Sequence, residues 1–187
     1  MAKLTLNSAL KKIRGGIDDW VYRRVGSKMV ISPRPEASMA PPTEGQLAVR
    51  NAFRAAASYG RASLADPARR AVYDAVALAR EQPVLSVAIG DFFNPPQVHV
   101  VDTSAYKGQV GDKIKVLASD DVEVMSVNID IRETGGTLIE QGAATKISEE
   151  WIYTATTAVA PGHPVKITAT ATDRPGNTGQ LGKDHTP

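Results

Sequence analysis

The sequence predicts an α+β protein: an N-terminal β-hairpin arm and a small α-helical hairpin, followed by an all-β sandwich. Three observations predict it. A short alternating strand pattern lies near the N-terminus, alanine-rich segments with helical spacing follow, and a period of two with frequent turns occupies the C-terminal half. We therefore divide the chain into a basic arm over 1–42, a helical segment of two to three helices over 43–97, and a sandwich over 98–187.

The arm contains a predicted β-hairpin. Its strands are Trp20–Arg24 and Lys28–Ile31, joined by a turn at Val25-Gly26-Ser27. Trp20 and Tyr22 share one face because strand side chains alternate. An isolated two-stranded hairpin is marginal in water, so we expect it to pair with the body of its own chain or with a neighbouring subunit. The predicted assembly interface consists of Trp20, Val21, Tyr22, Arg23, Arg24, Met29, Val30 and Ile31.

Start and stop signals define the helical segment. Thr43 and Gln46 have the spacing of a capping box, and Asp66-Pro67 places an N-cap before a proline at the first helical position. Pro83 ends the second helix, and a short third helix is expected over Val84–Phe93. The many alanines allow close approach and favour an αα-hairpin.

The C-terminal half changes to strand periodicity. Val127, Ile129 and Ile131 alternate with polar residues, and Gly135-Gly136 then turns the chain. Six or seven short strands separated by turns about every 8–12 residues fit a β-sandwich.

Residues 110–181 resemble bacterial and phage immunoglobulin-like domains. The resemblance is carried by Gly111-Asp112 before a strand, by Val127-x-Ile129-x-Ile131, by Trp151-x-Tyr153, and by the closing Asp173-x-x-Gly176-Asn177. The cysteine pair of many immunoglobulin domains is missing, because the chain has no cysteine. The resemblance implies an immunoglobulin-like sandwich with an adhesion, decoration or spacing role, although a fold does not fix a function.

The N-terminal half resembles short uncharacterised proteins of bacteria and their phages. They share a glycine (here Gly16), a basic hairpin (Trp20–Ile31), a proline-broken linker (Pro33–Pro42), and a helix with the pattern Thr43-x-x-Gln46-x-x-x-Arg50-x-x-Phe53. No activity transfers from this resemblance. It favours a structural protein of the phage or assembly type.

Charge is divided unevenly along the chain. Residues 1–90 hold 14 lysines and arginines against 7 carboxylates, whereas residues 91–187 hold 8 against 13. This asymmetry predicts either head-to-tail self-association or a polyanion partner for the basic end, with ordinary solvated faces as the alternative. The candidate polyanion contacts, which surround Trp20 and Tyr22, are Lys11, Lys12, Arg14, Lys28 and Arg34.

No motif for catalysis is present. The absence of cysteine excludes thiolate nucleophiles and Cys-ligated metals, and the sequence has neither a Gly-x-Ser-x-Gly elbow nor a phosphate-binding loop. The three histidines lack metal-ligand spacing. We therefore expect no enzyme and no cofactor. Asp120, Asp121 and Asp173 are candidate calcium ligands at strand ends, with ordinary turn aspartates as the favoured alternative.

The sequence thus predicts a non-catalytic structural protein that assembles into a particle or filament through its N-terminal arm and displays an immunoglobulin-like domain. The alternatives are a nucleic-acid-binding protein that uses the basic half, and an immunoglobulin-like adhesion or carbohydrate-binding module. The sequence lacks the apolar core of a signal peptide and a membrane-length apolar run, which predicts a cytoplasmic location or a phage-type particle, with release by lysis as a further route.

Overall fold

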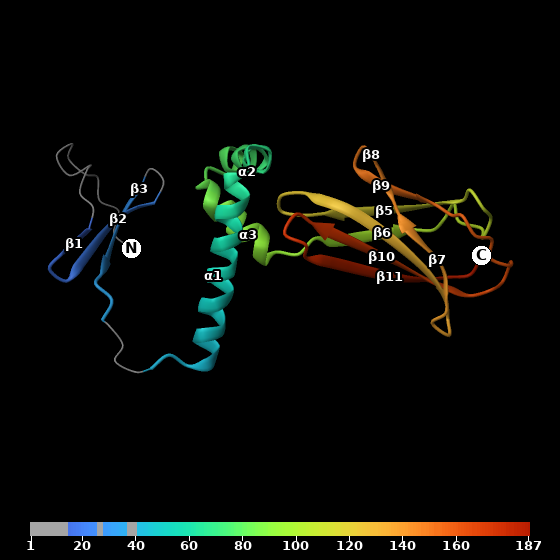
Figure 1. Ribbon diagram of the computed structural model, residues 1–187, viewed down its shortest axis with the longest axis horizontal. Coiled ribbons are helices and arrows are strands. Elements are labelled where there is room, and N and C mark those ends of the chain that lie inside the picture. Colours follow the sequence, from blue (N-terminus) through green and yellow to red (C-terminus); the bar gives the residue numbers. More distant parts are fainter. Residues whose placement is uncertain (1–14, 26–27, 37–40) are drawn as a thin grey trace.

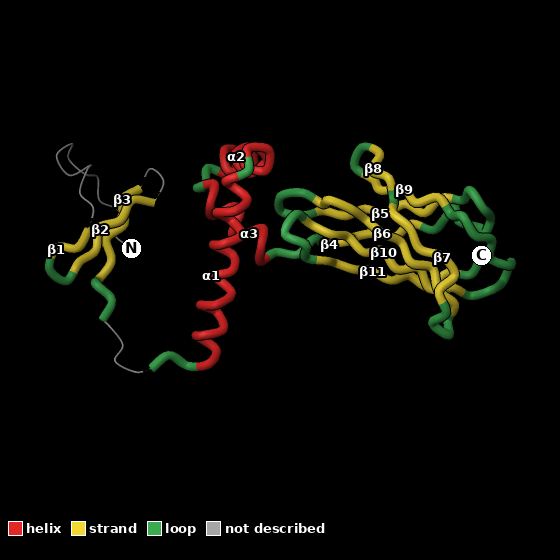
Figure 2. The backbone as a smooth tube through the Cα atoms, viewed as in Figure 1, coloured by secondary structure: helices red, strands yellow, loops and turns green. Residues whose placement is uncertain are grey.

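The computed structural model describes residues 15–25, 28–36 and 41–187. Three parts follow one another along the chain: a three-stranded sheet, a group of three helices, and a β-sandwich of two four-stranded sheets (Figures 1 and 2). The predicted mixed α+β architecture with a sandwich-like C-terminal half is confirmed.

The N-terminal sheet consists of β1 (Gly15–Ile17), β2 (Trp20–Val25) and β3 (Lys28–Pro33), all antiparallel. The predicted hairpin is present as β2 and β3. The prediction missed β1, which pairs Gly15 with Tyr22 and Ile17 with Trp20. The first half of β2 therefore lies in the middle of the sheet, and β1 and β3 are its two edge strands.

The three helices are α1 (Glu44–Ala65), α2 (Pro67–Arg80) and α3 (Val84–Phe93). The predicted capping box is formed, because the Gln46 amide donates to Thr43 Oγ1 and the Thr43 amide donates to Gln46 Oε1. The Asp66 side chain caps α2 by accepting a hydrogen bond from the Ala68 amide at 2.9 Å, with Pro67 at the first helical position. The predicted bounds of α3 are confirmed.

The predicted third helix is present, and the three helices form one unit. The buried stripe of α1 consists of Ala56, Gly60 and Ser63, and it packs mainly against α3. A Cβ atom on Gly60 would lie 2.9 Å from Leu85 Cδ1, so this glycine permits the close approach of the two helices. Small residues thus set the distance between α1 and α3.

The first half of α1 extends beyond the other two helices (Figure 1). Every residue from 44 to 55 is exposed. Two of its large apolar residues, Leu47 and Phe53, are 45% and 54% exposed. The periodicity identified the helix correctly, but the described chain holds no partner for this part of it.

The sandwich contains sheets of strand order β11-β10-β6-β7 and β4-β5-β9-β8. Its strands are β4 (Gln97–Asp102), β5 (Lys113–Ser119), β6 (Val124–Glu133), β7 (Leu138–Ala143), β8 (Thr145–Ile147), β9 (Glu150–Thr154), β10 (Val165–Asp173) and β11 (Thr178–His185). Short β8 was not predicted, and β11 pairs with β10 along its whole length.

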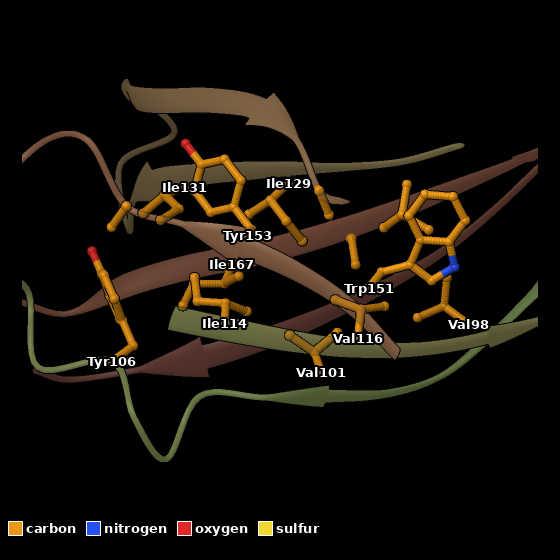
Figure 3. Close-up of a cluster of buried hydrophobic side chains, with 14 of the residues drawn as sticks. Val98, Val101, Tyr106, Ile114, Val116, Ile129, Ile131, Trp151, Tyr153 and Ile167 are labelled. Atoms are coloured by element: carbon orange, nitrogen blue, oxygen red, sulfur yellow. The ribbon is translucent and has the colours of Figure 1, made fainter. Parts of the chain in front are cut away.

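Alternating side chains of the two sheets build one core (Figure 3). Ile129 and Ile131 on β6 are fully buried, as is Ile114 on β5 of the other sheet. Trp151 and Tyr153, two residues apart on β9, both point into this core. The period of two therefore identified the buried face correctly. No helix within the described ranges has the length and apolarity needed to cross a membrane.

Candidate functional site

The N-terminal sheet has one predominantly apolar face. Directly paired residues of antiparallel strands lie on the same face, and Trp20 pairs with both Ile17 and Pro33. Tyr22 pairs with Ile31 and shares that face because it lies two residues from Trp20. We call this surface the apolar sheet face; its residues are Ile17, Trp20, Tyr22, Met29, Ile31 and Pro33.

This face is partly exposed to solvent: Ile17, Trp20 and Pro33 are exposed, whereas Tyr22, Met29 and Ile31 are half-buried. Ile17 and Trp20 are each 50% exposed, and neither belongs to a hydrophobic core of the described chain. No hydrogen bond or ion pair joins the described residues of 15–36 to those of 41–187, and the sheet stands apart from the helices in Figure 1. Exposed apolar patches on sheets are characteristic of interaction surfaces.

The predicted interface residues are divided between two faces. Val21 pairs with Ser32 on the opposite face, where Arg23 donates a hydrogen bond to Ser32 Oγ at 3.1 Å. Val30 pairs with Arg23 and lies on that face as well. Arg24 pairs with Met29, so its register places it on the apolar sheet face; its side chain lies outside the described residues. One face of the sheet is therefore predominantly apolar, and the opposite face carries both polar and apolar side chains.

Most of the candidate polyanion contacts cannot be placed. Lys11, Lys12 and Arg14 lie outside the described residues, as does the side chain of Lys28. Arg34 is described: its guanidinium lies over Gly16. The basic cluster around the aromatics therefore stays a prediction.

A second group of functional side chains lies where the helices meet the sandwich. Asp91 on α3 and the adjacent Asp120 and Asp121 between β5 and β6 each place a carboxylate oxygen within 4.8 Å of the other two. Two of the three predicted calcium ligands are thus brought together with a third carboxylate that was not predicted. We call these three residues the junction carboxylates.

Each junction carboxylate has one oxygen held by hydrogen bonds. Asp91 Oδ2 accepts from the Tyr73 hydroxyl at 2.5 Å, and Asp121 Oδ2 accepts from Asn94 Nδ2 at 3.1 Å. Asp120 Oδ2 accepts from the amides of the two residues after Asp121, at 3.0 and 2.9 Å. The Oδ1 atom of all three is buried without a hydrogen-bond partner. Such orphaned acceptors are uncommon in folded proteins.

Burial changes the acidity of the group. Burial chiefly raises the pKa of Asp91 to about 7; the hydrogen bond from Tyr73 opposes this increase, and the charges of Asp120, Asp121 and Asp173 add to it. Burial also raises the pKa of Asp120, against the lowering effect of its amide hydrogen bonds. The site therefore resists holding three negative charges.

Asp173 has a different role from the calcium ligand considered above. Its Oδ1 accepts from the Gly176 and Asn177 amides, and its Oδ2 accepts from Asn177 Nδ2. Asn177 Nδ2 also contacts the carbonyl oxygens of Asp91 and Phe92. The Asp-x-x-Gly-Asn sequence thus forms a turn that attaches the end of α3 to the sandwich.

Asp91 was missed because it lies far from the other aspartates in the sequence. One signal was available: it is the only charged residue of α3, whose other residues are largely apolar. A carboxylate in such a helix requires a partner when the helix is buried.

No protein-family model matches the sequence, and no curated protein matches it significantly. Among solved structures, CopC from Methylosinus trichosporium OB3b is 17% identical, over 49% of this chain and 91% of that one, with a TM-score of 0.36. A tandem repeat from the extending region of a large adhesion protein is 19% identical, over 50% of this chain and 24% of that one, with a TM-score of 0.38.

An engineered protein is 23% identical, with a TM-score of 0.37; the match covers 49% of this chain and spans 20% of that one. Likenesses of this size assign no family and no activity.

Proposed function

We propose that this chain is a non-catalytic structural protein that assembles with copies of itself through its N-terminal sheet and displays an immunoglobulin-like domain. The assembly we propose is a phage-type particle or a filament. The observation that carries the proposal is the apolar sheet face, whose two largest exposed side chains, Ile17 and Trp20, are each half exposed.

The free energy falls when a partner covers the exposed apolar face of a small sheet. At about 25 cal/mol per Å² of apolar area, coverage of one aromatic and several aliphatic side chains stabilises a contact by several kcal/mol. The unpaired edge of β3 adds backbone donors and acceptors that a neighbouring strand can satisfy, as in β-augmentation. Val49 and Phe53, four residues apart on one side of α1, are also exposed and provide a second, smaller apolar surface.

Charge favours a second copy of this chain as the partner. The N-terminal 90 residues are basic and the remaining 97 are acidic, so the arm of one copy is electrostatically complementary to the sandwich of another. A contact between two different surfaces is heterologous, and it either closes into a ring or continues as a fibre.

The strand order supports the immunoglobulin-like part of the proposal. In immunoglobulin domains, strands A, B, E and D form one sheet, and G, F, C and C′ the other. Taking β4 as strand A, the sheets β4-β5-β9-β8 and β11-β10-β6-β7 follow this order. Within these strands His99 Nε2 lies 2.6 Å from Ser119 Oγ on the exposed surface, and the described hydrogen bonds and ion pairs join no carboxylate to this histidine.

Burial of the aromatics weighs against the carbohydrate-binding alternative. Such a module is expected to expose aromatic side chains on its sandwich. From residue 97 onward the only aromatic residues are Tyr106, Trp151 and Tyr153, which are 0%, 6% and 4% exposed. The nucleic-acid alternative depends mostly on basic residues outside the described ranges. The experiment below distinguishes it from self-assembly.

The test is sedimentation velocity of the full chain over a wide range of concentrations. We expect oligomers in the unmodified protein, and their loss in the double variant Ile17→Ser/Trp20→Ser. The control is Leu78→Ser, which removes an 82% exposed side chain from α2 and should leave assembly unchanged. A monomer at every concentration contradicts the proposal. A monomer that shifts the mobility of DNA or RNA in a salt-dependent way supports the nucleic-acid alternative instead.

A further inference from the structure

We propose that the junction carboxylates, Asp91, Asp120 and Asp121, bind a Ca²⁺ ion that fastens helix α3 to the β5–β6 turn of the sandwich. This inference is independent of self-assembly and concerns a different part of the chain.

Asp91 is buried without a partner for one of its carboxylate oxygens. Its residue surface is 0% exposed, and its Oδ1 atom has no hydrogen-bond partner. A buried carboxylate is strongly destabilising unless it is neutralised, paired with a cation or coordinated to a metal. No ion pair of the described residues involves Asp91 or Asp120. The group therefore lacks the positive charge that its burial requires.

The neighbouring cation does not supply that charge. Arg80 donates to the backbone oxygen of Asp121, and its Nη1 lies 4.0 Å from Asp121 Oδ2. Arg80 therefore pairs with Asp121 alone among the three carboxylates, and at a long distance. The other charged pair close in sequence, Arg174 with Glu123, is already formed.

The surrounding hydrogen bonds hold the three carboxylates in place. The hydrogen bonds from Tyr73, from Asn94 and from the two backbone amides hold the Oδ2 atoms and leave all three Oδ1 atoms buried and unpartnered. Outer hydrogen bonds of this kind orient metal-binding carboxylates in known sites. Tyr73 is itself positioned by a 2.8 Å contact with the Tyr59 hydroxyl.

The chemistry of the donors selects the ion. Three carboxylates form a hard, anionic oxygen site, which suits Ca²⁺ or Mg²⁺ rather than softer metals. Oxygens up to 4.8 Å apart fit on opposite sides of Ca²⁺, whose bonds are about 2.3–2.6 Å long. Mg²⁺ bonds are about 2.0–2.1 Å long and demand a stricter octahedron, so we expect weaker binding of Mg²⁺.

Binding would have a mechanical consequence. Asp91 belongs to the helical unit, and Asp120 and Asp121 belong to the sandwich. An ion shared by them links the two parts at the point where the Asn177 side chain already contacts the end of α3. Occupation of the site should therefore stabilise the whole junction.

The experiment is calorimetric titration of the chelator-treated full-length protein with CaCl₂ to about 10 mM, beyond the millimolar range of weak Ca²⁺ modules. Thermal unfolding is recorded in parallel with CaCl₂, MgCl₂ or chelator. We expect saturable Ca²⁺ binding, a higher Tm with Ca²⁺ than with Mg²⁺, and at least a tenfold loss of affinity in Asp91→Asn and in Asp121→Asn. Asp184→Asn, which removes an exposed carboxylate on β11, is the matched control and should bind normally.

Two results would overturn the inference. One is the absence of both binding heat and any Tm shift in folded wild-type protein. The other is unchanged Ca²⁺ affinity in folded Asp91→Asn and Asp121→Asn. If Tm instead rises on acidification and does not respond to Ca²⁺, Asp91 is protonated and no ion is bound.

Discussion

The chain contains two tryptophans, and they report on two different kinds of β-sheet. Trp151 on β9 lies between the layers of the sandwich and is 6% exposed, whereas Trp20 on β2 lies in the N-terminal sheet and is 50% exposed. Both follow the alternation of a strand with one apolar face. The difference lies in the second layer: the sandwich supplies its own, and the described N-terminal sheet has none.

Whether an apolar sheet face contributes to folding or to assembly depends on whether the same chain covers it. A sheet stabilises a fold when its apolar face is covered, and two four-stranded sheets cover each other in residues 97–187. Three short strands offer the same chemistry without a cover. The same residue pattern therefore predicts a core in one region and a contact surface in the other.

Replacing each tryptophan in turn tests whether the two sheets differ in their contribution to stability. Trp151→Ala should lower the free energy of unfolding by about 3–5 kcal/mol, because a large buried side chain leaves a cavity. Trp20→Ala should change the unfolding of the sandwich by less than about 0.5 kcal/mol, the usual range for surface positions. Urea denaturation of both variants at low protein concentration measures the difference; equal losses would show that Trp20 is part of the folded core.

A pair of glycines on β11 sharpens the account of how the sandwich joins the helices. A Cβ atom at Gly179 would collide with the carbonyl oxygen of Pro96, in the connection between α3 and β4, whereas one at Gly182 would meet the flexible Lys166 side chain at 3.2 Å. Gly179→Ala should therefore destabilise the protein by about 1–3 kcal/mol and Gly182→Ala by clearly less. Thermal unfolding compares them, and an indifferent Gly179→Ala would mean that the connection can move away.

The pH dependence of stability distinguishes the junction from the rest of the sandwich. The pKa of Asp91 is raised from 3.8 to about 7 in the folded state, so between those values the native state binds more protons than the unfolded state. Stability should then decrease as pH rises from about 4 to about 7, by on the order of 1 kcal/mol per pH unit. Asp91→Asn should remove most of this slope in chelator and leave the smaller contribution of Asp120, whose pKa is also raised by burial. Asp112, whose pKa is lowered by amide hydrogen bonds, acts in the opposite direction and only at more acidic pH.

The smallest expected effect concerns the exposed half of α1. Thr43→Ala removes the capping box and should cost about 0.5–1 kcal/mol of local helix stability. Because residues 44–55 are exposed, the loss should appear as faster hydrogen exchange there with almost no change in global unfolding. A global destabilisation of the same size would indicate that this half of α1 packs against something in the isolated chain.

Local signals in the sequence were sufficient for most of the fold. The capping box at Thr43, the proline after Asp66 and the alternation around Ile129 act over a few residues, and each predicted its element correctly. Strand β1 was missed because Gly15–Ile17 is only three residues long and contains two glycines, which carry no strand signal.

Contacts between distant residues could not be predicted in the same way. The capping box and the helical spacing identified α1, but they do not show where its partner helix ends, and Leu47 and Phe53 are exposed. Asp120 and Asp121 were recognised as candidate ligands, whereas Asp91 joins them only through the packing of α3 on the sandwich. Asp173 also has a carboxylate, but both of its oxygens accept hydrogen bonds within its own turn.

Trp20 provides the most direct test of assembly through the N-terminal sheet. In Trp151→Phe it is the only tryptophan, and its quenching by acrylamide can be followed as protein concentration increases. We predict strong quenching in the dilute protein and progressive protection as oligomers form, with no such change for Trp151 in Trp20→Phe. Trp20 that stays equally accessible at all concentrations, or that is already protected in a monomer, would contradict the account.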